Sequence, residues 1–488
     1  MNALLLALLI PLGGAVLVQL LGRWENLRDG SIVVVASVLF GVVLSILPHI
    51  EAGGRPTYEL VEVLPGLVLG LKVEPLGMLF ALVASGLWIL TSIYGFGYMR
   101  GHHEENQTRF FTCFAIAIFA AIGVAFSRNL FTLFTFYEVL TFSTYPLVTH
   151  HQTDEAKRAG RIYMGILVST SVCFLLLAVI WTQHLAGTTE FTPGGILDGK
   201  VSGAMVPLLL ALFVFGTGKA AVMPFHRWLP AAMVAPTPVS ALLHAVAVVK
   251  AGVFTVLKVV VYIFGLEFLA LTHASTWLLW AATITILVAS VVALTKDNLK
   301  ARLAYSTISQ LSYIVLGAAF ASTAGAIGAG MHIAMHAVGK ITLFFCAGAV
   351  MVCAHKKNIS QMHGLGRRMP WTFGAFAIGS MSIIGLPFSG GMWSKWFLGV
   401  GAFDGGHGVF AGVLMVSSLL SIGYLVPVFG RAFLGTPDEH EHEHEHDDGV
   451  SNLEREHPLV VIPPVLTALG CVVLFFHSER LYTLLAGM

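Results

Sequence analysis

Apolar stretches long enough to cross a lipid bilayer recur from one end of this chain to the other. Hydrophobic residues make up 56% of its 488 residues and charged residues 11%, whereas a soluble globular domain carries about 25% charged residues. A helix needs about 20 mostly apolar residues to cross the hydrocarbon layer. The sequence therefore predicts an all-α polytopic membrane protein with about fourteen spans, some of them broken, which start near residues 3, 31, 77, 111, 129, 162, 204, 238, 275, 303, 326, 371, 409 and 459.

Basic residues outside these spans lie mostly in one set of loops. Loops after odd-numbered spans contain Arg23, Arg28, Arg100, Arg109, Lys157, Arg158, Arg161, Arg227, Lys296, Lys300, Arg302, Lys356, Lys357, Arg367, Arg368, Arg431 and Arg455, and loops after even-numbered spans contain Arg55, Lys72, Arg128 and Lys200. Cytoplasmic loops carry an excess of Lys and Arg. The odd-numbered loops are therefore expected in the cytoplasm and both termini outside, in a multi-pass protein of the inner or plasma membrane.

Several ionisable residues lie inside the apolar segments. Glu138 is expected to be the only deeply placed acid, and the basic residues are Lys219, Lys250, Lys340 and Lys395. A charge at the bilayer centre costs at least ~2.5–3.5 kcal/mol, and such residues usually mark an ion or proton pathway. Lys258 is expected toward a helix end, where its ammonium would reach the interface.

The expected spans divide into blocks. Three spans without a buried ionisable residue precede two blocks of five spans each, and a loop rich in His and acidic residues separates the second block from the last span. The boundaries are 1–105, 106–270, 271–435, 436–457 and 458–488.

The fourth span of each five-span block is interrupted by proline beside a lysine. Pro224 follows Lys219, and Pro387 precedes Lys395. Matching broken helices in two halves indicate inverted repeats with a site near the midplane, and an odd number of spans per block reverses the second block. The alternative is that Gly and Pro are simply common in membrane helices.

His332, His336 and Lys340 are spaced four residues apart, so a helix would place them on one face. Histidine titrates near neutral pH, and such a row could pass protons. Two histidines at this spacing can also share zinc, but the segment contains no HExxH glutamate and no nearby cysteine. Ordinary structural histidines are the third possibility.

Glu138 requires a partner, because an isolated buried carboxylate becomes neutral. Lys219 is the expected one. The pair would act either as a switch that lets Lys219 release a proton, or as a static clamp between helices.

Four segments carry a family resemblance: NLFTLFTFYEVLTFSTYPLV, GKAAVMPFHRWLPAAMVAPTPVSALLHAVAVVKAGVF, DNLKARLAYSTISQLSYI and HGLGRRMPWTFGAFAIGSMSIIGLPFSGGMWSKWFL. From about residue 75 to 434 the chain resembles the antiporter-like subunits of respiratory complex I and of Mrp-type multisubunit cation/proton antiporters. APTPVSALLHAVAVVKAGVF and GLGRRMPWTFGAF resemble the D-type Mrp subunits most.

The resemblance implies a role for each ionisable residue. Glu138 and Lys219 match the family's essential pair, Lys250 with His244 nearby matches its central lysine, and Lys395 matches its terminal proton carrier. His332, His336 and Lys340 would continue the axis. One middle complex I subunit has a glutamate at the last place, so Lys395 argues against that subunit.

The expected function is proton translocation within a multisubunit complex, most simply Mrp-type Na⁺/H⁺ or K⁺/H⁺ antiport. The alternatives are a proton-pumping subunit of a complex I-like quinone reductase or membrane-bound hydrogenase, a subunit of a bicarbonate-uptake complex, and a passive membrane scaffold. The sequence contains no phosphate-binding, haem or iron–sulfur motif, so no cofactor, bound metal or nucleic acid is expected. The partners would be other membrane subunits, the bilayer and the transported ions.

The loop TPDEHEHEHEHDDGVSNLEREH alternates Glu and His between the last two spans. It is expected on the cytoplasmic side as a solvated loop, with a low-affinity metal or proton buffer as the alternative.

Overall fold

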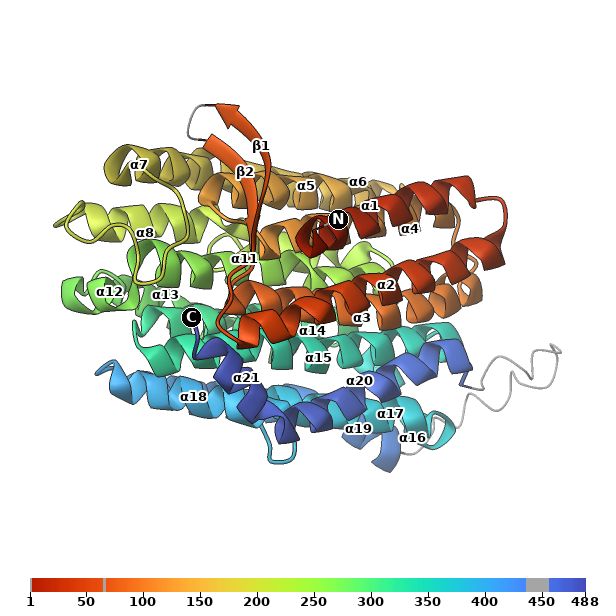
Figure 1. Cartoon of the computed structure of the whole chain (residues 1–488). Coiled ribbons are helices and arrows are strands. Elements are labelled where there is room, and N and C mark those ends of the chain that lie inside the picture. Colours follow the sequence, from red (N-terminus) through yellow and green to blue (C-terminus); the bar gives the residue numbers. More distant parts are fainter. Residues whose placement is uncertain (1, 65–66, 436–455) are drawn as a thin grey trace, which may run out of the picture.

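The computed structural model describes residues 2–64, 67–435 and 456–488, and nearly all of its regular structure is helical (Figure 1). The His-rich loop therefore lies almost wholly outside the described residues. The first three helices are α1 (Ala3–Leu20), α2 (Glu25–Glu51) and α3 (Pro75–Gly101). The next group is α4 (Gln107–Ala125), α5 (Leu130–Val148), α6 (Asp154–Thr170), η1 (Ser171–Leu175), α7 (Leu176–Ala186), α8 (Met205–Gly216), η2 (Gly218–Ala220), α9 (Trp228–Ala231), η3 (Ala232–Val234), α10 (Thr237–Ala241), η4 (Leu242–Val246), α11 (Val248–Val259), η5 (Val260–Phe264) and α12 (Leu266–Thr272).

The remaining elements are mostly long helices joined by short connections. They are α13 (Thr276–Thr295), α14 (Leu299–Ala319), α15 (Thr323–Ala354), η6 (Ile359–Gln361), α16 (Leu365–Arg368), α17 (Pro370–Ile384), α18 (Gly390–Asp404), α19 (Val409–Leu434), α20 (Pro458–Phe476) and α21 (Ser478–Leu485).

Within the described residues, nine helices are long and apolar enough to cross a membrane, or up to ten if the bent pair formed by Val248–Phe264 and Leu266–Thr272 is one span. The prediction of an all-α polytopic membrane protein is confirmed at this level. The other segments expected to span are helical as well, but they are short, interrupted or more polar: α5, α8, α14 and the pair α17 and α18.

A β-hairpin that was not predicted from the sequence joins α2 to α3. Strands β1 (Thr57–Leu64) and β2 (Leu67–Lys72) pair antiparallel. Its second strand is fastened to the start of α5, because Asn129 Nδ2 donates to the Val68 carbonyl at 2.7 Å and Gly70 N donates to Thr132 Oγ1 at 3.0 Å. Figure 1 shows the hairpin beside one end of the helices, the same end at which the chain finishes.

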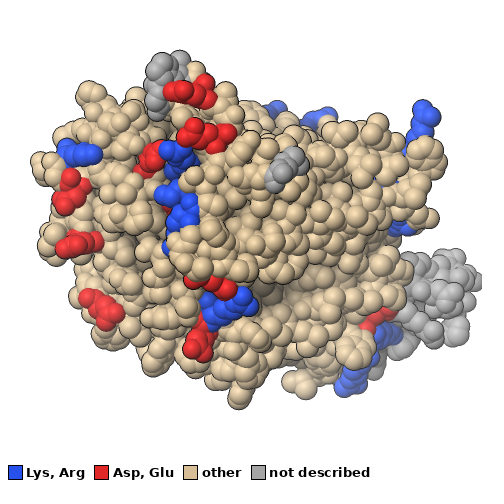
Figure 2. Space-filling view, in the orientation of Figure 1, with Lys and Arg blue, Asp and Glu red and all other residues tan. Residues whose placement is uncertain are grey.

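Charged side chains gather toward the two ends of the helices. Figure 2 shows Lys, Arg, Asp and Glu on either side of a broad band of other residues. Apolar side chains on the outer helices are exposed, as in Val16, Val34, Trp280, Val291 and Leu419. A band of exposed apolar side chains with charged residues on either side is typical of a protein surrounded by a lipid bilayer.

Helices α11 and α15 form the centre of the molecule. Every residue of α11 is buried, and α15 packs against α3, α14, α17, α18 and α20. A helix that is apolar and enclosed on all sides belongs to the core of a bundle. The ionisable residues on these two helices are therefore shielded from lipid.

Gly252 lets α11 approach the interrupted segment that contains Lys219. A Cβ at Gly252 would meet the backbone of Lys219 and Ala220. This close packing sets the distance between two of the predicted site residues, and it explains why the helix carries glycine in its interior despite the cost of about 1 kcal/mol relative to alanine.

Candidate functional site

Lys250 and His336 meet in the middle of the bundle. Lys250 Nζ on α11 lies 2.5 Å from His336 Nδ1 on α15, and both side chains are buried. A protonated lysine can only donate in this contact, so the imidazole nitrogen that faces it is then the acceptor. The sequence predicted both residues but did not predict that they would touch.

His332 continues the row from His336 along one face of α15. The two imidazole rings lie 5.8 Å apart, at an interplanar angle of 23°. His332 Nε2 lies 3.1 Å from Gln310 Oε1 and His332 Nδ1 lies 2.9 Å from Ser394 Oγ. Both ring nitrogens are therefore engaged with neutral groups.

Lys340 lies on the same helical face, next to α14. Its ammonium donates to Ser306 Oγ at 2.8 Å, and Ser306 donates to Tyr424 Oη at 3.1 Å. Ser306 and Gln310 are four residues apart on α14, so that helix contacts both Lys340 and His332. The prediction that His332, His336 and Lys340 share one face is confirmed.

Lys395 lies where the interrupted helix resumes. Its ammonium donates to the Ile384 carbonyl at 3.0 Å, in the last turn of α17, and to Ser418 Oγ at 2.9 Å on α19. It also lies 4.9 Å from the centre of the Tyr313 ring. Because Tyr313 stacks on His332 with 5.5 Å between centroids, one aromatic ring touches both ends of this stretch.

The two predicted helix breaks are present. α8 ends at Gly216 and Lys219 lies in the short turn η2 that follows, while α17 ends at Ile384 and α18 begins at Gly390. In each case the lysine bonds to a main-chain carbonyl. For Lys395 this carbonyl is freed by the helix break itself, because Ile384 is the last residue of α17, whereas the carbonyl that Lys219 meets belongs to Tyr137 within α5.

Lys219 bonds to α5 but not through Glu138. Its ammonium donates to the Tyr137 carbonyl at 2.9 Å and to Thr141 Oγ1 at 2.5 Å, and it lies 3.2 Å from the centre of the Tyr137 ring. No ion pair with Glu138 occurs in the part of the chain that the structure describes. The two segments meet as expected, and the charge pair stays a prediction.

Glu138 is only half-buried, and its Oε1 atom is enclosed without a hydrogen-bond partner among the described residues. Enclosing a carboxylate oxygen without a hydrogen-bond donor has a desolvation cost that lowers the stability of the fold. His244, the other residue expected beside Lys250, lies in the π-helical turn η4, and its side chain is outside the described residues.

The prediction for Lys258 was wrong. Its side chain does not reach the interface; it is fully buried, with Nζ 3.2 Å from Glu74 Oε2 and 2.8 Å from the Ser127 carbonyl. Glu74, which was not predicted from the sequence, also lies 3.2 Å from Lys72 Nζ. The signal was present as a glutamate directly before Pro75, at the start of an apolar segment, where it takes the N-cap position of α3.

The predicted site residues therefore form two groups: a set joined by contacts, and Lys219, which lies apart from it. Lys250 bonds to His336, His336 stacks on His332, and the Tyr313 ring lies between His332 and Lys395. Lys219 lies at the other side of α11, held by α5. Within the described ranges, no group of three or more His, Cys, Asp or Glu side chains is arranged to hold a metal ion. The chemistry available is proton transfer between neighbouring nitrogen and oxygen atoms.

Comparison with known families gives one match over most of this region. The family described as NADH:quinone oxidoreductase/Mrp antiporter, transmembrane, matches residues 127–421. This range contains every predicted site residue.

Curated relatives come from two kinds of complex. NADH-quinone oxidoreductase subunit N of Desulforudis audaxviator (strain MP104C) is 31% identical over 413 residues, which cover 82% of this chain and 81% of the relative. Subunit L of the enzyme of that name from Escherichia coli (strain K12) is 28% identical, with coverage of 97% and 77%. A probable K⁺/H⁺ antiporter protein of Rhizobium meliloti (strain 1021), of the A/B subunit type, is 30% identical, with coverage of 74% and 36%.

Two solved structures share the fold. A chain of the Mrp complex from Dietzia sp. DQ12-45-1b superposes with a TM-score of 0.83 at 20% identity and covers 99% of this chain and 96% of its own length. A chain of an archaeal membrane-bound sulfane sulfur reductase superposes with a TM-score of 0.86 at 23% identity, with coverage of 100% and 97%. The architecture is thus one that occurs in multisubunit membrane complexes.

Proposed function

The chain belongs to the NADH:quinone oxidoreductase/Mrp antiporter family, and from this premise we propose that it carries protons across a membrane as one subunit of a larger assembly. The row from Lys250 to Lys395 would be the carrier. The supporting observation is that four ionisable side chains, on three helices, follow one another in the core, with the Tyr313 ring between His332 and Lys395.

The Lys250–His336 contact has the geometry for a direct proton step. The steps from His336 to His332 and from His332 to Lys395 would pass through water, because those side chains meet by ring stacking and through the Tyr313 ring. Lys250 donates toward His336 Nδ1 at 2.5 Å, and His332 has hydrogen-bond partners at both ring nitrogens. Proton transfer requires donor and acceptor within hydrogen-bond reach, directly or through one water. A proton received by His336 would leave Lys250 neutral and ready for the next one, so the buried site need not hold two positive charges at once.

The cost of these residues argues for a role in transport. A charge at the bilayer centre costs at least ~2.5–3.5 kcal/mol on insertion scales. A passive scaffold could use leucine at Lys250 and Lys395 and avoid that cost. The functional row explains the lysines, and a scaffold does not.

The finer architecture that supports this role is also a proposal. Fourteen spans in two inverted blocks, 106–270 and 271–435, would place the Lys219 break and the Lys395 break at equivalent depths from opposite sides. The basic loops would face the cytoplasm and both termini the other side of the inner or plasma membrane.

Mrp-type antiport of Na⁺ or K⁺ against protons is the parent activity we favour. The segments around Pro236–Val253 and Gly364–Phe376 resemble the D-type Mrp subunits, and Lys395 stands where one middle complex I subunit has glutamate. The similarity to NADH-quinone oxidoreductase subunit N supports a second candidate, a redox-driven proton pump in which partner subunits perform the redox chemistry.

Proton flux in membrane vesicles that contain the assembled complex tests the proposal. Lys250→Ala should abolish flux, and Lys250→His should retain part of it, because imidazole can still exchange a proton with His336. Lys200→Ala is the matched control, since Lys200 is exposed and bonds to the Ala186 carbonyl, far from the row in sequence. Wild-type flux in an assembled Lys250→Ala complex would remove the row from the mechanism.

A further inference from the structure

Three histidines surround one glutamate where α3, α4 and α5 end or begin. His151 Nε2 lies 3.1 Å from both carboxylate oxygens of Glu104, His102 Nδ1 lies 3.4 Å from Oε1, and His150 Nε2 lies 3.7 Å from Oε2. The Glu104 side chain is 8% exposed. These four residues, called here the Glu104 cluster, play no part in the row described above.

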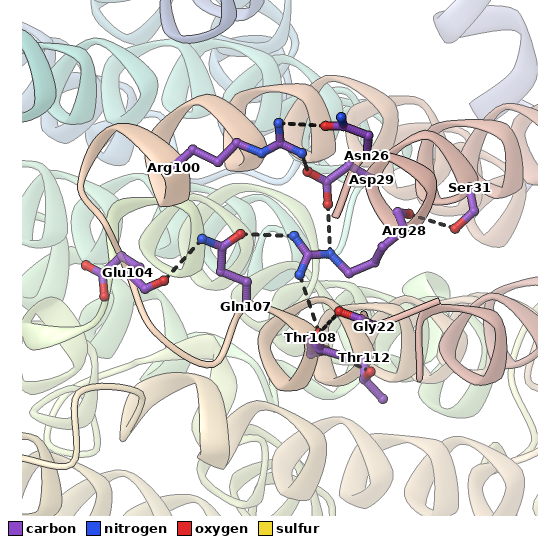
Figure 3. A network of polar contacts seen from close by, with 10 residues as sticks. All are labelled: Gly22, Asn26, Arg28, Asp29, Ser31, Arg100, Glu104, Gln107, Thr108 and Thr112. Carbon is purple, nitrogen blue, oxygen red and sulfur yellow. Dashed lines mark hydrogen bonds and ion pairs between the residues drawn. The ribbon is translucent and has the colours of Figure 1, made fainter. Parts of the chain in front are cut away.

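A second network holds the Glu104 cluster in place. Figure 3 shows Gln107 donating to the Glu104 carbonyl at 3.1 Å while its own side-chain oxygen accepts from Arg28 at 3.0 Å. Arg28 and Arg100 both pair with Asp29, at 2.8 and 2.5 Å. The carboxylate of Glu104 points away from this network in Figure 3. Its main chain is therefore fixed while its side chain stays available to the histidines.

The Glu104 cluster borders a cavity of about 510 Å³. His102, Glu104 and His151 line it together with Lys300, and its wall also includes Thr237 and Ala347. A cavity of this size has room for several water molecules, since one water occupies about 30 Å³ of liquid. Water in it would reach from the Glu104 cluster to Thr237 and Ala347.

Two helices connect this cavity to the row. α15 contributes Ala347 to the cavity wall and Lys340 to the row, seven residues apart, which is about 10 Å along a helix. α14 contributes Lys300 to the wall and Ser306, the acceptor for Lys340. The inner end of the cavity thus lies about two helical turns from Lys340.

The histidines of the Glu104 cluster stabilise its carboxylate, whereas burial disfavours the charged form of His150. Burial raises the pKa of Glu104, but the hydrogen bond from His151 and the nearby His150 and His102 charges outweigh it and lower that pKa overall. Burial lowers the pKa of His150 to about 4, against the opposing effect of the Glu104 charge. The other ionisable groups around the cluster are Tyr98, Glu105, Arg109, Glu155, Lys300, Lys356 and Lys357.

We propose that the Glu104 cluster takes up protons from water at the end of the helices that carries Lys300, Lys356 and Lys357, and passes them through the cavity toward Lys340 and on to Lys250, where the row begins. The inference rests on the proposed function. In this step a proton leaves a water-borne donor for a histidine of the cluster, Glu104 balances the charge, and the histidine then releases the proton to water in the cavity.

The competing explanation is a clamp that only ties α3, α4 and α5 together. The two explanations differ in pH dependence. If Glu104 favours protonated histidine, replacing it with glutamine removes the negative charge that lies 3.1 Å from His151 Nε2 and makes the protonated form less favourable. Uptake would then fail at a lower pH than in the wild type, whereas a weakened clamp would reduce flux equally at every pH.

The test is the pH profile of proton flux in inside-out vesicles that contain the assembled complex, with the outer pH varied from about 6 to about 9, a range that spans histidine titration. Glu104→Gln should shift the alkaline limb of the profile down by ~1 pH unit, a loss of about tenfold at fixed alkaline pH. Glu105→Gln is the matched control, because Glu105 is adjacent in sequence and exposed. His151→Gln is a second variant, on the more exposed side of the Glu104 cluster, and should shift the profile in the same direction.

Superimposable profiles for wild type and either assembled variant would overturn the inference and leave the proposed function intact. A uniform loss at all pH values would overturn it too, in favour of the clamp. Absence of flux in the wild type would instead overturn the proposed function, so the two failures are distinguishable.

Discussion

The ring of Tyr313 stacks on the imidazole of His332, with 5.5 Å between centroids and 17° between planes. The same ring also contacts the ammonium of Lys395, 4.9 Å from the centroid. Tyr313 therefore lies against two cations of the row when both are protonated, and its π-face stabilises the lysine.

Tyr313→Phe should keep most of the proton flux, because the ring stays and only the hydrogen bond from Tyr313 Oη to the Leu414 carbonyl is lost. Tyr313→Ala should reduce flux strongly, since it removes the packing that aligns His332 and Lys395. Flux in vesicles, normalised to assembled protein, measures both. Equal flux in the alanine variant and the wild type would show that the ring does not position the row.

Replacement of Glu138 tests whether it acts with Lys219. Glu138→Gln should abolish flux while the complex still assembles, because Lys219 keeps its bonds to Tyr137 and Thr141 without any help from that carboxylate. Thr135→Val, which removes a half-buried hydroxyl that bonds within α5, is the control. Normal flux in the glutamine variant would remove Glu138 from the mechanism.

Glu74 should matter for stability more than for the row. Glu74→Gln leaves Lys258 buried without its anionic partner, and breaking a buried pair in this way costs about 3–5 kcal/mol. The variant should therefore melt at a lower temperature in detergent. Glu59→Gln is matched to it, because Glu59 pairs with Arg128 on an exposed part of the neighbouring hairpin and such pairs contribute about 0–1 kcal/mol. Similar melting temperatures for both variants would contradict the assignment of Lys258 and Glu74 as a pair.

Gly252→Ala should destabilise the protein, because the added Cβ meets the Lys219 and Ala220 backbone. Forcing extra volume into a packed core costs about 1–3 kcal/mol. Gly165→Ala is the control, since that glycine, on α6, has nothing within 4 Å of an added Cβ. A thermal-unfolding comparison decides: if both variants unfold alike, α11 and the broken segment are not in close contact.

The sequence predicted the parts of the site that have a helical period or a breaker residue. The spacing of His332, His336 and Lys340 sufficed to place them on one face, and Pro224 and Pro387 marked both helix breaks. Contacts between different helices were harder to predict from the sequence. The Lys250–His336 contact joins residues 86 positions apart, and spacing along one helix carries no information about which neighbour it packs against.

The contact between Glu74 and Lys258 is a second example of packing between helices that the sequence did not reveal. The prediction for Lys258 used only its position within its own helix. A position near the helix end suggested that its ammonium would reach the membrane interface. The partner of Lys258 lies far earlier in the chain, at the start of α3, and only the packing of α3 against α11 brings the two together. The hairpin was missed because its short apolar strands give a weak signal among spans of about twenty residues.

The enclosure of α11 has a consequence for how this protein is made. A segment that contains both Lys250 and Lys258 would be a poor substrate for lateral release into lipid, since each lysine near the bilayer centre opposes insertion by ~2.5–3.5 kcal/mol. Every residue of α11 is buried by other parts of the chain, and Glu74 is synthesised long before Lys258. We therefore expect biogenesis to be cooperative: the ribosome delivers α11 to a bundle that already contains its counter-ion, and the helix leaves the translocon into protein instead of lipid.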